Sequence, residues 1–379
     1  MKRDSFVGRI LNWIKHDPVL FASLILAIIS MFFVPPSAAY LGYLDWHVLG
    51  LLLSLMLVVA GLKQAGVFSA LVNALLRKIH NARVLSVVLI LVCFFGSMFI
   101  TNDVALITFV PLTILLLTQT GQQKLMIPII VLETIAANLG SMFTPLGNPQ
   151  NLYLYSLSGM PTLEFLRLML IPTLASLLLL LACTCFIKRE SLTISNDEIP
   201  MQFHWKQSAI WFALFAICLL TVAHVLHFII TLVIVLVAVV ILNRKLLRDA
   251  DFALLLTFSF FFIFVGNIKS IPAVSEALSA IIGGRELMAG VLLSQVISNV
   301  PAAMLLSGFT TQYSELILGV NLGGLGTLIA SMASLISYKA YCGMKDANTV
   351  RYLAVFTILN IVFLVILWVL VKLLLPVLL

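Results

Sequence analysis

Charged residues are scarce in this sequence. Only 10% of its 379 residues are Asp, Glu, Lys or Arg, whereas 62% are hydrophobic, and the mean hydropathy is +1.16. Soluble globular domains carry about 25% charged and about 45–50% apolar residues. No soluble core of this length needs such an apolar excess, so the solvent must be lipid. A spanning helix needs roughly 20 apolar residues, and we predict one all-α polytopic membrane domain with about ten spans.

Sequence patterns of enzymes are also absent. The five cysteines show neither metal-ligand spacing nor a disulfide framework. There is no H-E-x-x-H, no G-x-S-x-G and no phosphate-binding loop, so the chemistry of an ATP-driven pump or an intramembrane protease is missing. The net charge of +7 resides mainly in short loops, where basic residues set membrane topology. We expect no enzymatic activity, no nucleic-acid partner, no cofactor, and no metal apart from Na⁺ as a coupling ion.

A polar stretch at 188–206 divides the chain into two halves. We assign residues 1–187 to a first repeat that begins with an amphipathic N-terminal helix. Residues 188–206 form a cytoplasmic linker, and residues 207–379 form a linking span followed by a second repeat. Basic residues concentrate near the predicted inner ends of the spans, as the positive-inside rule requires. This predicts a multi-pass protein of the inner membrane, with its N-terminus in the cytoplasm and its C-terminus outside.

Two apolar runs, 83–119 and 287–310, are each interrupted by a polar tip. The tips are Thr101-Asn102-Asp103 and Ser298-Asn299. Each run is either two full spans or a re-entrant hairpin whose tip stops inside the membrane. The segment 287–297 is too short to cross a bilayer, so we favour hairpins. Non-helical backbone at this depth is tolerated where it lines a cavity.

The two halves of the chain resemble each other. Residues 138–155 and 321–338 align at a fixed offset. The matched pairs include Asn138 with Asn321, Gly140 with Gly323, and Thr144 with Thr327. The polar tips match in the same order, and one spare span between the halves turns the second repeat upside down. Inverted repeats with discontinuous helices are the architecture of many secondary transporters, whose site lies where the breaks meet.

The stretch 140–151 cannot continue as a helix, because it holds two glycines and two prolines. Carbonyls freed by such a break can bind a cation, and amides at a helix start can hold an anion. We predict ligands for the coupling cation at Asp103, Asn138, Thr144, Gly147, Asn148, Asn151 and Asn321. We predict substrate contacts at Thr101, Asn102, Ser298, Asn299, Gly323 and Thr327. The alternative is that these segments are ordinary small-residue packing motifs between spans.

Two carboxylates in apolar segments each have two interpretations. An ionisable residue inside a membrane is costly and usually functional. Asp103, whose counterpart is Val300, binds Na⁺ or a proton, or else caps a helix start beside an aqueous vestibule. Glu133 relays protons, or else pairs with a cation such as Lys269 across the bundle.

These residues resemble motifs of the ion transporter superfamily, which includes divalent-anion:sodium symporters, citrate permeases, arsenite permeases and NhaD-type sodium/proton antiporters. The similarity spans about residues 17–375. The first tip resembles the asparagine-aspartate motif of arsenite permeases, and both tips resemble the Ser-Asn-Thr tips of dicarboxylate symporters. Residues 144–151 resemble the Thr-Pro-x-Gly-x-Pro-x-Asn break of those symporters. Residues 319–323 and 331–335 resemble the second-half motif of arsenite permeases.

The resemblance implies two hairpins, a substrate held between their tips, and elevator motion of a transport domain against a scaffold that is often dimeric. Two departures count against parts of this pattern. Asp103 and Val300 stand where dicarboxylate symporters carry a third-position Thr, which argues against dicarboxylate-type binding. The second break lacks prolines, which argues against a second sodium site there. The residues in their place are Leu328, Ala330 and Met332.

We therefore predict a secondary active transporter that moves a small anion by an elevator mechanism, coupled to Na⁺ or H⁺. A sodium/proton antiporter and an arsenite or metalloid permease are the open alternatives. An intramembrane enzyme would need a nucleophile–base pair or metal cluster at depth, and an assembly subunit would not need paired polar breaks. The expected partners are the lipid bilayer, a small anionic solute and a second copy of the chain in a homodimer.

Overall fold

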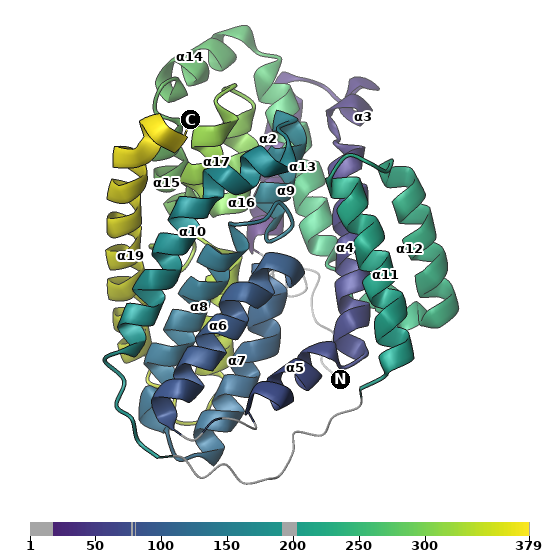
Figure 1. Cartoon of the computed structure of the whole chain (residues 1–379). Coiled ribbons are helices and arrows are strands. Elements are labelled where there is room, and N and C mark those ends of the chain that lie inside the picture. The colour runs from purple at the N-terminus through teal and green to yellow at the C-terminus, as the bar shows by residue number, and fades with distance from the viewer. Residues whose placement is uncertain (1–17, 77–78, 80, 192–202, 379) are drawn as a thin grey trace, which may run out of the picture.

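A computed structural model (Figure 1) describes residues 18–76, 79, 81–191 and 203–378. Within these residues the chain is almost entirely α-helical and contains no β-strand, which confirms the predicted all-α class. The amphipathic helix predicted in the first 17 residues lies outside the described part of the chain. Residues 192–202, which make up most of the predicted linker, lie outside it too.

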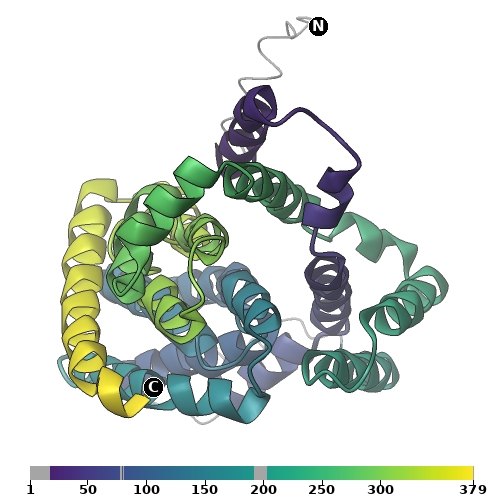
Figure 2. The same cartoon turned by 90° about the horizontal axis from the view of Figure 1, so that it is seen from above.

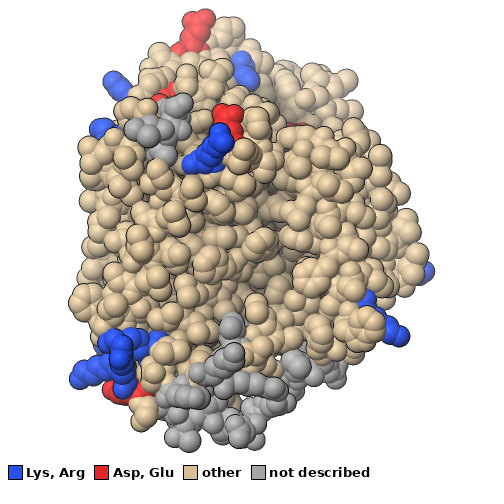
Figure 3. All heavy atoms as spheres, viewed as in Figure 1, with Lys and Arg blue, Asp and Glu red and all other residues tan. Residues whose placement is uncertain are grey.

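Eight helices of the described chain are long and apolar enough to cross a membrane. They are α4 (Trp46–Gln64), α6 (Ala82–Ile100), α7 (Asn102–Gln119), η1 (Gln123–Leu125) with α8 (Met126–Ser141), α10 (Thr162–Thr184), α11 (Trp205–Val222), α13 (Phe252–Lys269) and α19 (Thr349–Leu378). Two shorter apolar helices, α2 (Pro18–Phe33) and α12 (Phe228–Leu242), accompany them. A broad band across the middle of the surface in Figure 3 carries no charged side chain. These features identify a multi-pass membrane protein.

The remaining helical elements of the described chain are short. They are α3 (Ala39–Tyr43), α5 (Val67–Leu76), α9 (Pro149–Ser158), η2 (Arg244–Arg248), α14 (Pro272–Ile282), α15 (Glu286–Ile297), α16 (Asn299–Ser307), α17 (Tyr313–Leu322) and α18 (Met332–Cys342). α14 and α15 meet at an angle of 108°. Most of these short helices interrupt or join the spans, and they carry the polar tips and breaks.

The two polar runs differ in length. In the second run, α15 and α16 have 12 and 9 residues, fewer than the roughly 20 that a span needs. In the first run, α6 and α7 have 19 and 18 residues, so each is long enough to cross the membrane alone. Helix length therefore favours a hairpin in the second run and does not distinguish the alternatives in the first, where re-entrant insertion stays a prediction.

Seen from above, the helices form two groups (Figure 2). In the first group, which we call the arc, α2 packs along α13, and α11 and α12 pack along α4. The second group, which we call the core bundle, contains α6–α9 and α15–α18, with α10 and α19 packed against its outside. The arc lies along one side of the core bundle.

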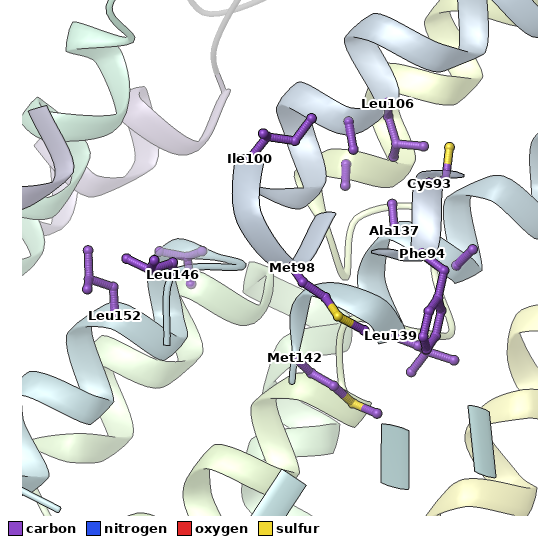
Figure 4. Close-up of a cluster of buried hydrophobic side chains, with 14 of the residues drawn as sticks. Cys93, Phe94, Met98, Ile100, Leu106, Ala137, Leu139, Met142, Leu146 and Leu152 are labelled. Carbon is purple, nitrogen blue, oxygen red and sulfur yellow. The ribbon is translucent and has the colours of Figure 1, made fainter. Parts of the chain in front are cut away.

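α8 lies at the centre of the core bundle, with α6, α7, α10, α18 and α19 around it. Its residues are all buried except Pro128, as expected for a helix that is apolar on every side. Phe94 and Met98 of α6 lie against Leu139 of α8 (Figure 4). Within lipid, such contacts hold helices together mainly by van der Waals packing.

A polar cluster ties the lower end of the core bundle in Figure 1 to the segment after α10. The Lys124 ammonium donates to both carboxylate oxygens of Glu190, at 2.7 and 2.9 Å, and Gln122 Nε2 donates to the same carboxylate at 3.1 Å. Arg83 Nε donates to the carbonyl of Ile187 at 2.7 Å. The hydrogen bond from Lys124 holds the pKa of Glu190 below its ordinary value. Exposed pairs of this kind stabilise only weakly, so the cluster orients the chain rather than holding the fold.

Two glycines bring α15 and α17 into backbone contact, and we expect Gly319→Ala to destabilise the protein. A Cβ on Gly319 would lie 2.5 Å from the carbonyl oxygen of Leu287, and one on Gly290 would lie 2.9 Å from the carbonyl carbon of Gly319. Small residues permit such close approach between membrane helices. Because backbone atoms cannot rotate away, the substitution should cost about 1–3 kcal/mol, measured as a lower unfolding midpoint of the purified protein.

The matched control is Gly42→Ala. No atom lies within 4 Å of a Cβ built at Gly42, so this variant should unfold at the wild-type midpoint or slightly above it. Equal losses in the two variants would contradict the proposed backbone contact.

Candidate functional site

Two residues with an unusual backbone conformation mark the polar tips. Thr101 joins α6 to α7 with φ 70° and ψ 152°, and Ser298 joins α15 to α16 with φ 75° and ψ 155°. This combination of φ and ψ is essentially reserved for glycine, and holding any other residue in it costs about 1–3 kcal/mol. Such strain persists only where the surroundings impose it, and it is common at ligand sites.

Each tip is tied to a break in a neighbouring helix. The N–H of Asn102 donates to the carbonyl of Gly147 at 3.0 Å, and the N–H of Asn299 donates to the carbonyl of Ala330 at 2.9 Å. Gly147 and Ala330 occupy matching places in the two halves of the chain, at the same offset that matches Asn138 with Asn321. The two tips are therefore held by equivalent hydrogen bonds.

The helices break where the sequence predicts. Residues 142–148 separate α8 from α9, and residues 323–331 separate α17 from α18. Asn148 caps the start of α9 through its side-chain oxygen. A Cβ on Gly147 would lie 2.0 Å from the carbonyl oxygen of Ser141, so only glycine fits there. Glycine and proline chemistry thus explains the first break directly.

A side-chain amide satisfies the carbonyls that the first break sets free. Asn151 Nδ2 donates to the carbonyls of Met142 and Thr144, each at 3.1 Å. The Thr144 hydroxyl donates to the carbonyl of Met98 in α6 at 2.5 Å. The predicted residues Thr144 and Asn151 therefore lie at the break, and both fasten it to its surroundings.

Gln295 of α15 plays the corresponding part at the second break, although the sequence analysis did not select it. Its Nε2 donates to the carbonyls of Gly323 and Leu325 at 2.9 and 3.0 Å. Its Oε1 accepts from the N–H of Thr327 at 2.9 Å, and the Thr327 hydroxyl donates to the Gln295 carbonyl at 3.0 Å. The only hint in the sequence was that Gln295 is an amide residue in the apolar segment 287–297, three residues before Ser298. Thr327 itself is exposed.

Buried side chains connect the two breaks. Asn148 Nδ2 donates to Asn321 Oδ1 at 3.1 Å, and Asn321 Nδ2 donates to Asn151 Oδ1 at 2.6 Å. The Ser331 hydroxyl donates to Asn138 Oδ1 at 3.0 Å. Leaving one buried partner unpaired costs about 1–3 kcal/mol. These bonds join residues from both halves of the chain into one polar centre.

Asn138 also links the first tip to the second break. Its Oδ1 accepts from Asn102 Nδ2 at 3.1 Å, and its Nδ2 donates to the carbonyl of Gly324 at 3.4 Å. A Cβ on Gly324 would lie only 2.9 Å from the side-chain nitrogen of Asn299. Of the predicted site residues, the buried asparagines of both tips and both breaks thus lie close together, whereas Thr327 is exposed. These asparagines are Asn102, Asn138, Asn148, Asn151, Asn299 and Asn321.

A cavity of about 570 Å³ opens between the first tip and the arc. Its polar lining consists of Thr101, Asp103 and Asn148 from the core bundle and Lys63, Gln64, Asp249 and Asp251 from the side of the arc. Asp103 lies in the first turn of α7, where the helix dipole favours a carboxylate. Its Oδ1 is buried and has no hydrogen-bond partner. Three carboxylates face one ammonium group, so the electrostatic potential of the cavity favours cations.

Glu133 lies apart from this cavity. Its side chain is completely buried in α8, its Oε1 accepts from the Thr113 hydroxyl at 2.5 Å, and its Oε2 has no partner. Lys269, the cation proposed as its partner, instead lines a cavity with Glu286. The structure therefore does not bring Glu133 together with Lys269, and a proton relay at Glu133 stays a prediction.

The sequence is similar to membrane transport proteins. A family described as citrate transporter matches residues 9–316. The inner membrane protein YbiR of Escherichia coli is 34% identical over 330 residues, which cover 84% of this chain and 87% of that protein. An uncharacterized transporter of Methanocaldococcus jannaschii is 33% identical over 326 residues, which cover 85% and 88%. A silicon efflux transporter of Oryza sativa is 31% identical over 160 residues, which cover 41% and 32%.

Backbone strain at the tips predicts a stability difference between glycine and alanine variants. We expect Thr101→Gly and Ser298→Gly to be more stable than Thr101→Ala and Ser298→Ala, because glycine relieves about 1–3 kcal/mol of strain. Glycine also adds entropy to the unfolded chain, which reduces the net difference. Both substitutions remove the hydroxyl group, so the comparison of unfolding midpoints isolates the backbone. Alanine variants as stable as the glycine variants would show that the tips are not strained.

Proposed function

This chain belongs to the citrate transporter family, and from that premise we propose a secondary active transporter that moves a small anion across the inner membrane, coupled to Na⁺ or H⁺. Its span-length helices and its relatives make it a membrane transporter. The solute and the coupling ion are our proposal. The proposal depends chiefly on one observation: the carboxylate of Asp103 lines a cavity beside the tip, and its buried Oδ1 has no hydrogen-bond partner.

Inverted repeats are supported by hydrogen bonds that recur in both halves. The bond from the Thr144 hydroxyl to Met98 corresponds to the bond from the Thr327 hydroxyl to Gln295. The helices from α2 to α10 also match those from α12 to α19 in order, although α6 and α7 are longer than α15 and α16. The single helix α11 between them would invert the second series relative to the first.

The direction of two arc helices supports the inversion. The end of α4 and the start of α13 line one cavity, with Lys63 and Asp251. The start of α4 and the end of α13 line another cavity, with Asp45 and Lys269. α4 and α13 therefore run antiparallel, as matching helices of inverted repeats should.

The coupling cation in this proposal binds at Asp103 before the anion binds. The Asp103 cavity holds more carboxylates than ammonium groups, so an anion would be repelled until a cation neutralises Asp103. The anion would then contact amides and hydroxyl groups of the two tips, chiefly Thr101, Asn102, Ser298 and Asn299. Because linkage is reciprocal, the anion must strengthen cation binding by the same factor.

An elevator mechanism is consistent with the grouping of the helices. The polar centre joins both tips and both breaks within the core bundle. Residues of α4 that face this bundle across the Asp103 cavity are mostly apolar, including Leu52, Leu55 and Met56. We propose that the core bundle moves as one body past the arc and carries the site with it. A homodimer formed through the arc would hold the arc still in the membrane.

Two alternatives have specific support. The net negative charge of the Asp103 cavity also suits a sodium/proton antiporter, in which no anion moves. The similarity to a silicon efflux transporter suits a permease for a neutral metalloid acid, because the polar centre is built from uncharged amides and hydroxyl groups. Measurements of coupling and of substrate choice separate these activities.

We expect Asp103→Asn to abolish coupled uptake without reducing the amount of folded protein. The amide keeps the shape of the side chain but removes the charge that holds the cation. Uptake should be measured in proteoliposomes with an imposed Na⁺ or pH gradient. Asp346→Asn, on an exposed loop, is the matched control and should transport normally. Gradient-driven uptake at the wild-type rate in Asp103→Asn would remove Asp103 from the mechanism.

Ligand-dependent stability should identify the solute and the coupling ion. A ligand that binds only the folded state adds about 2.7 kcal/mol of stability at a hundred times its dissociation constant. We expect the unfolding midpoint to rise with Na⁺ or with proton concentration, and to rise further with one small anion, such as citrate, only when that cation is present. Stabilisation by arsenite or silicic acid without any anion effect would favour the metalloid permease instead.

A further inference from the structure

A second polar cavity, of about 560 Å³, lies at the end of α13, away from the cavity that Asp103 lines. It is bordered by the end of α13, by α14, by the start of α15 and by the segment between α16 and α17. Its polar side chains are Lys269, Ser275, Ser279, Glu286, Ser307, Thr310, Thr311, Gln312 and Tyr313. This lining is rich in hydroxyl groups, and none of the roles proposed above uses it.

Glu286 is the buried acid of this cavity. Its side chain is only 1% exposed. Its Oε1 accepts from the Thr310 hydroxyl at 2.8 Å, but its Oε2 is buried and has no hydrogen-bond partner. A buried carboxylate with an unsatisfied oxygen is costly, and such groups normally gain a partner. Glu286 also lines the cavity, so the cavity is the side from which a partner for this carboxylate can come.

The neighbouring charges favour a cation as that partner. Glu315, in the first turn of α17, lies close enough to Glu286 for their charges to repel each other. Lys269 lines the same cavity, yet within the described chain it forms no ion pair with either carboxylate. Within the described chain, neither Glu286 nor Glu315 therefore has a salt-bridge partner.

We propose that Glu286 anchors a cation site in this cavity, distinct from the Asp103 site, and that the Thr310 hydroxyl supplies a second oxygen ligand. Hard cations take carboxylate and hydroxyl oxygens as ligands. Glu286 and Lys269 balance each other's charge in the lining, so a monovalent ion adds less excess positive charge than a divalent ion would. The site takes Na⁺ or an ion of similar charge and size. It lies at the base of the second hairpin, away from the tips, so it does not depend on the proposed transport mechanism.

The test measures thermal unfolding of the full-length purified protein while NaCl replaces choline chloride at constant ionic strength. Four proteins are compared: wild type, Asp103→Asn, Glu286→Gln and the double variant. We expect Asp103→Asn to keep a rise in midpoint with Na⁺. We expect the double variant to lose that rise. Glu276→Gln, an exposed acid on the adjacent α14, is the matched control and should behave as wild type.

Thr310→Val provides a second test that keeps the carboxylate. In the Asp103→Asn background, Thr310→Val should raise severalfold the Na⁺ concentration at which half of the rise in unfolding midpoint is reached. This variant remains informative if Glu286→Gln fails to fold. The proposal is overturned if Asp103→Asn alone removes all Na⁺ stabilisation. That result would mean that Na⁺ does not bind at Glu286 and that water satisfies Oε2 instead. The proposal is also overturned if the double variant responds to Na⁺ as Asp103→Asn does. Failure of the Asp103 mechanism would instead appear as normal coupled uptake in Asp103→Asn, so the two failures are distinguishable.

Discussion

A bilayer core offers no water to hydrogen-bond the backbone, so every N–H and C=O group at that depth needs a partner within the protein. In the long helices of this chain the partners are local. At the two breaks they are not, and the protein supplies them from elsewhere: Asn151 and Gln295 donate to the freed carbonyls, and each tip donates one N–H to the break beside it. Tips and breaks therefore depend on one another, which explains why they occur together.

The same requirement shapes the chemistry of the site. Amide side chains both donate and accept hydrogen bonds. Asn148 therefore pairs with Asn321, and Asn138 with Ser331, across the two halves of the chain without any net charge. The polar centre is thus neutral and internally satisfied. Asp103 differs from these amides, because it is a carboxylate and its Oδ1 has no hydrogen-bond partner.

Features that depend on local chemistry were predictable from the sequence. The break at 142–148 follows from Pro145 and Gly147, and the paired asparagines Asn138 and Asn321 were evident from the internal repeat. Features that depend on packing were not predictable. Nothing near Gln295 in the sequence shows that it reaches the second break, because its partners lie about 30 residues further along the chain. The lengths of α6 and α7 show the same limit, since length alone does not reveal how deep a tip lies.

The backbone of the two tips is alike, but their charge is not. Asp103 follows the first tip, whereas the buried Val300 occupies the corresponding place after the second. If the core bundle moved across the membrane field, the carboxylate of Asp103 would carry one negative charge with it, and a monovalent cation bound there would cancel that charge. Moving one elementary charge across 100 mV changes the free energy by about 2.3 kcal/mol. Cation binding at Asp103 would therefore change the work that the membrane potential does on the moving bundle by up to that amount.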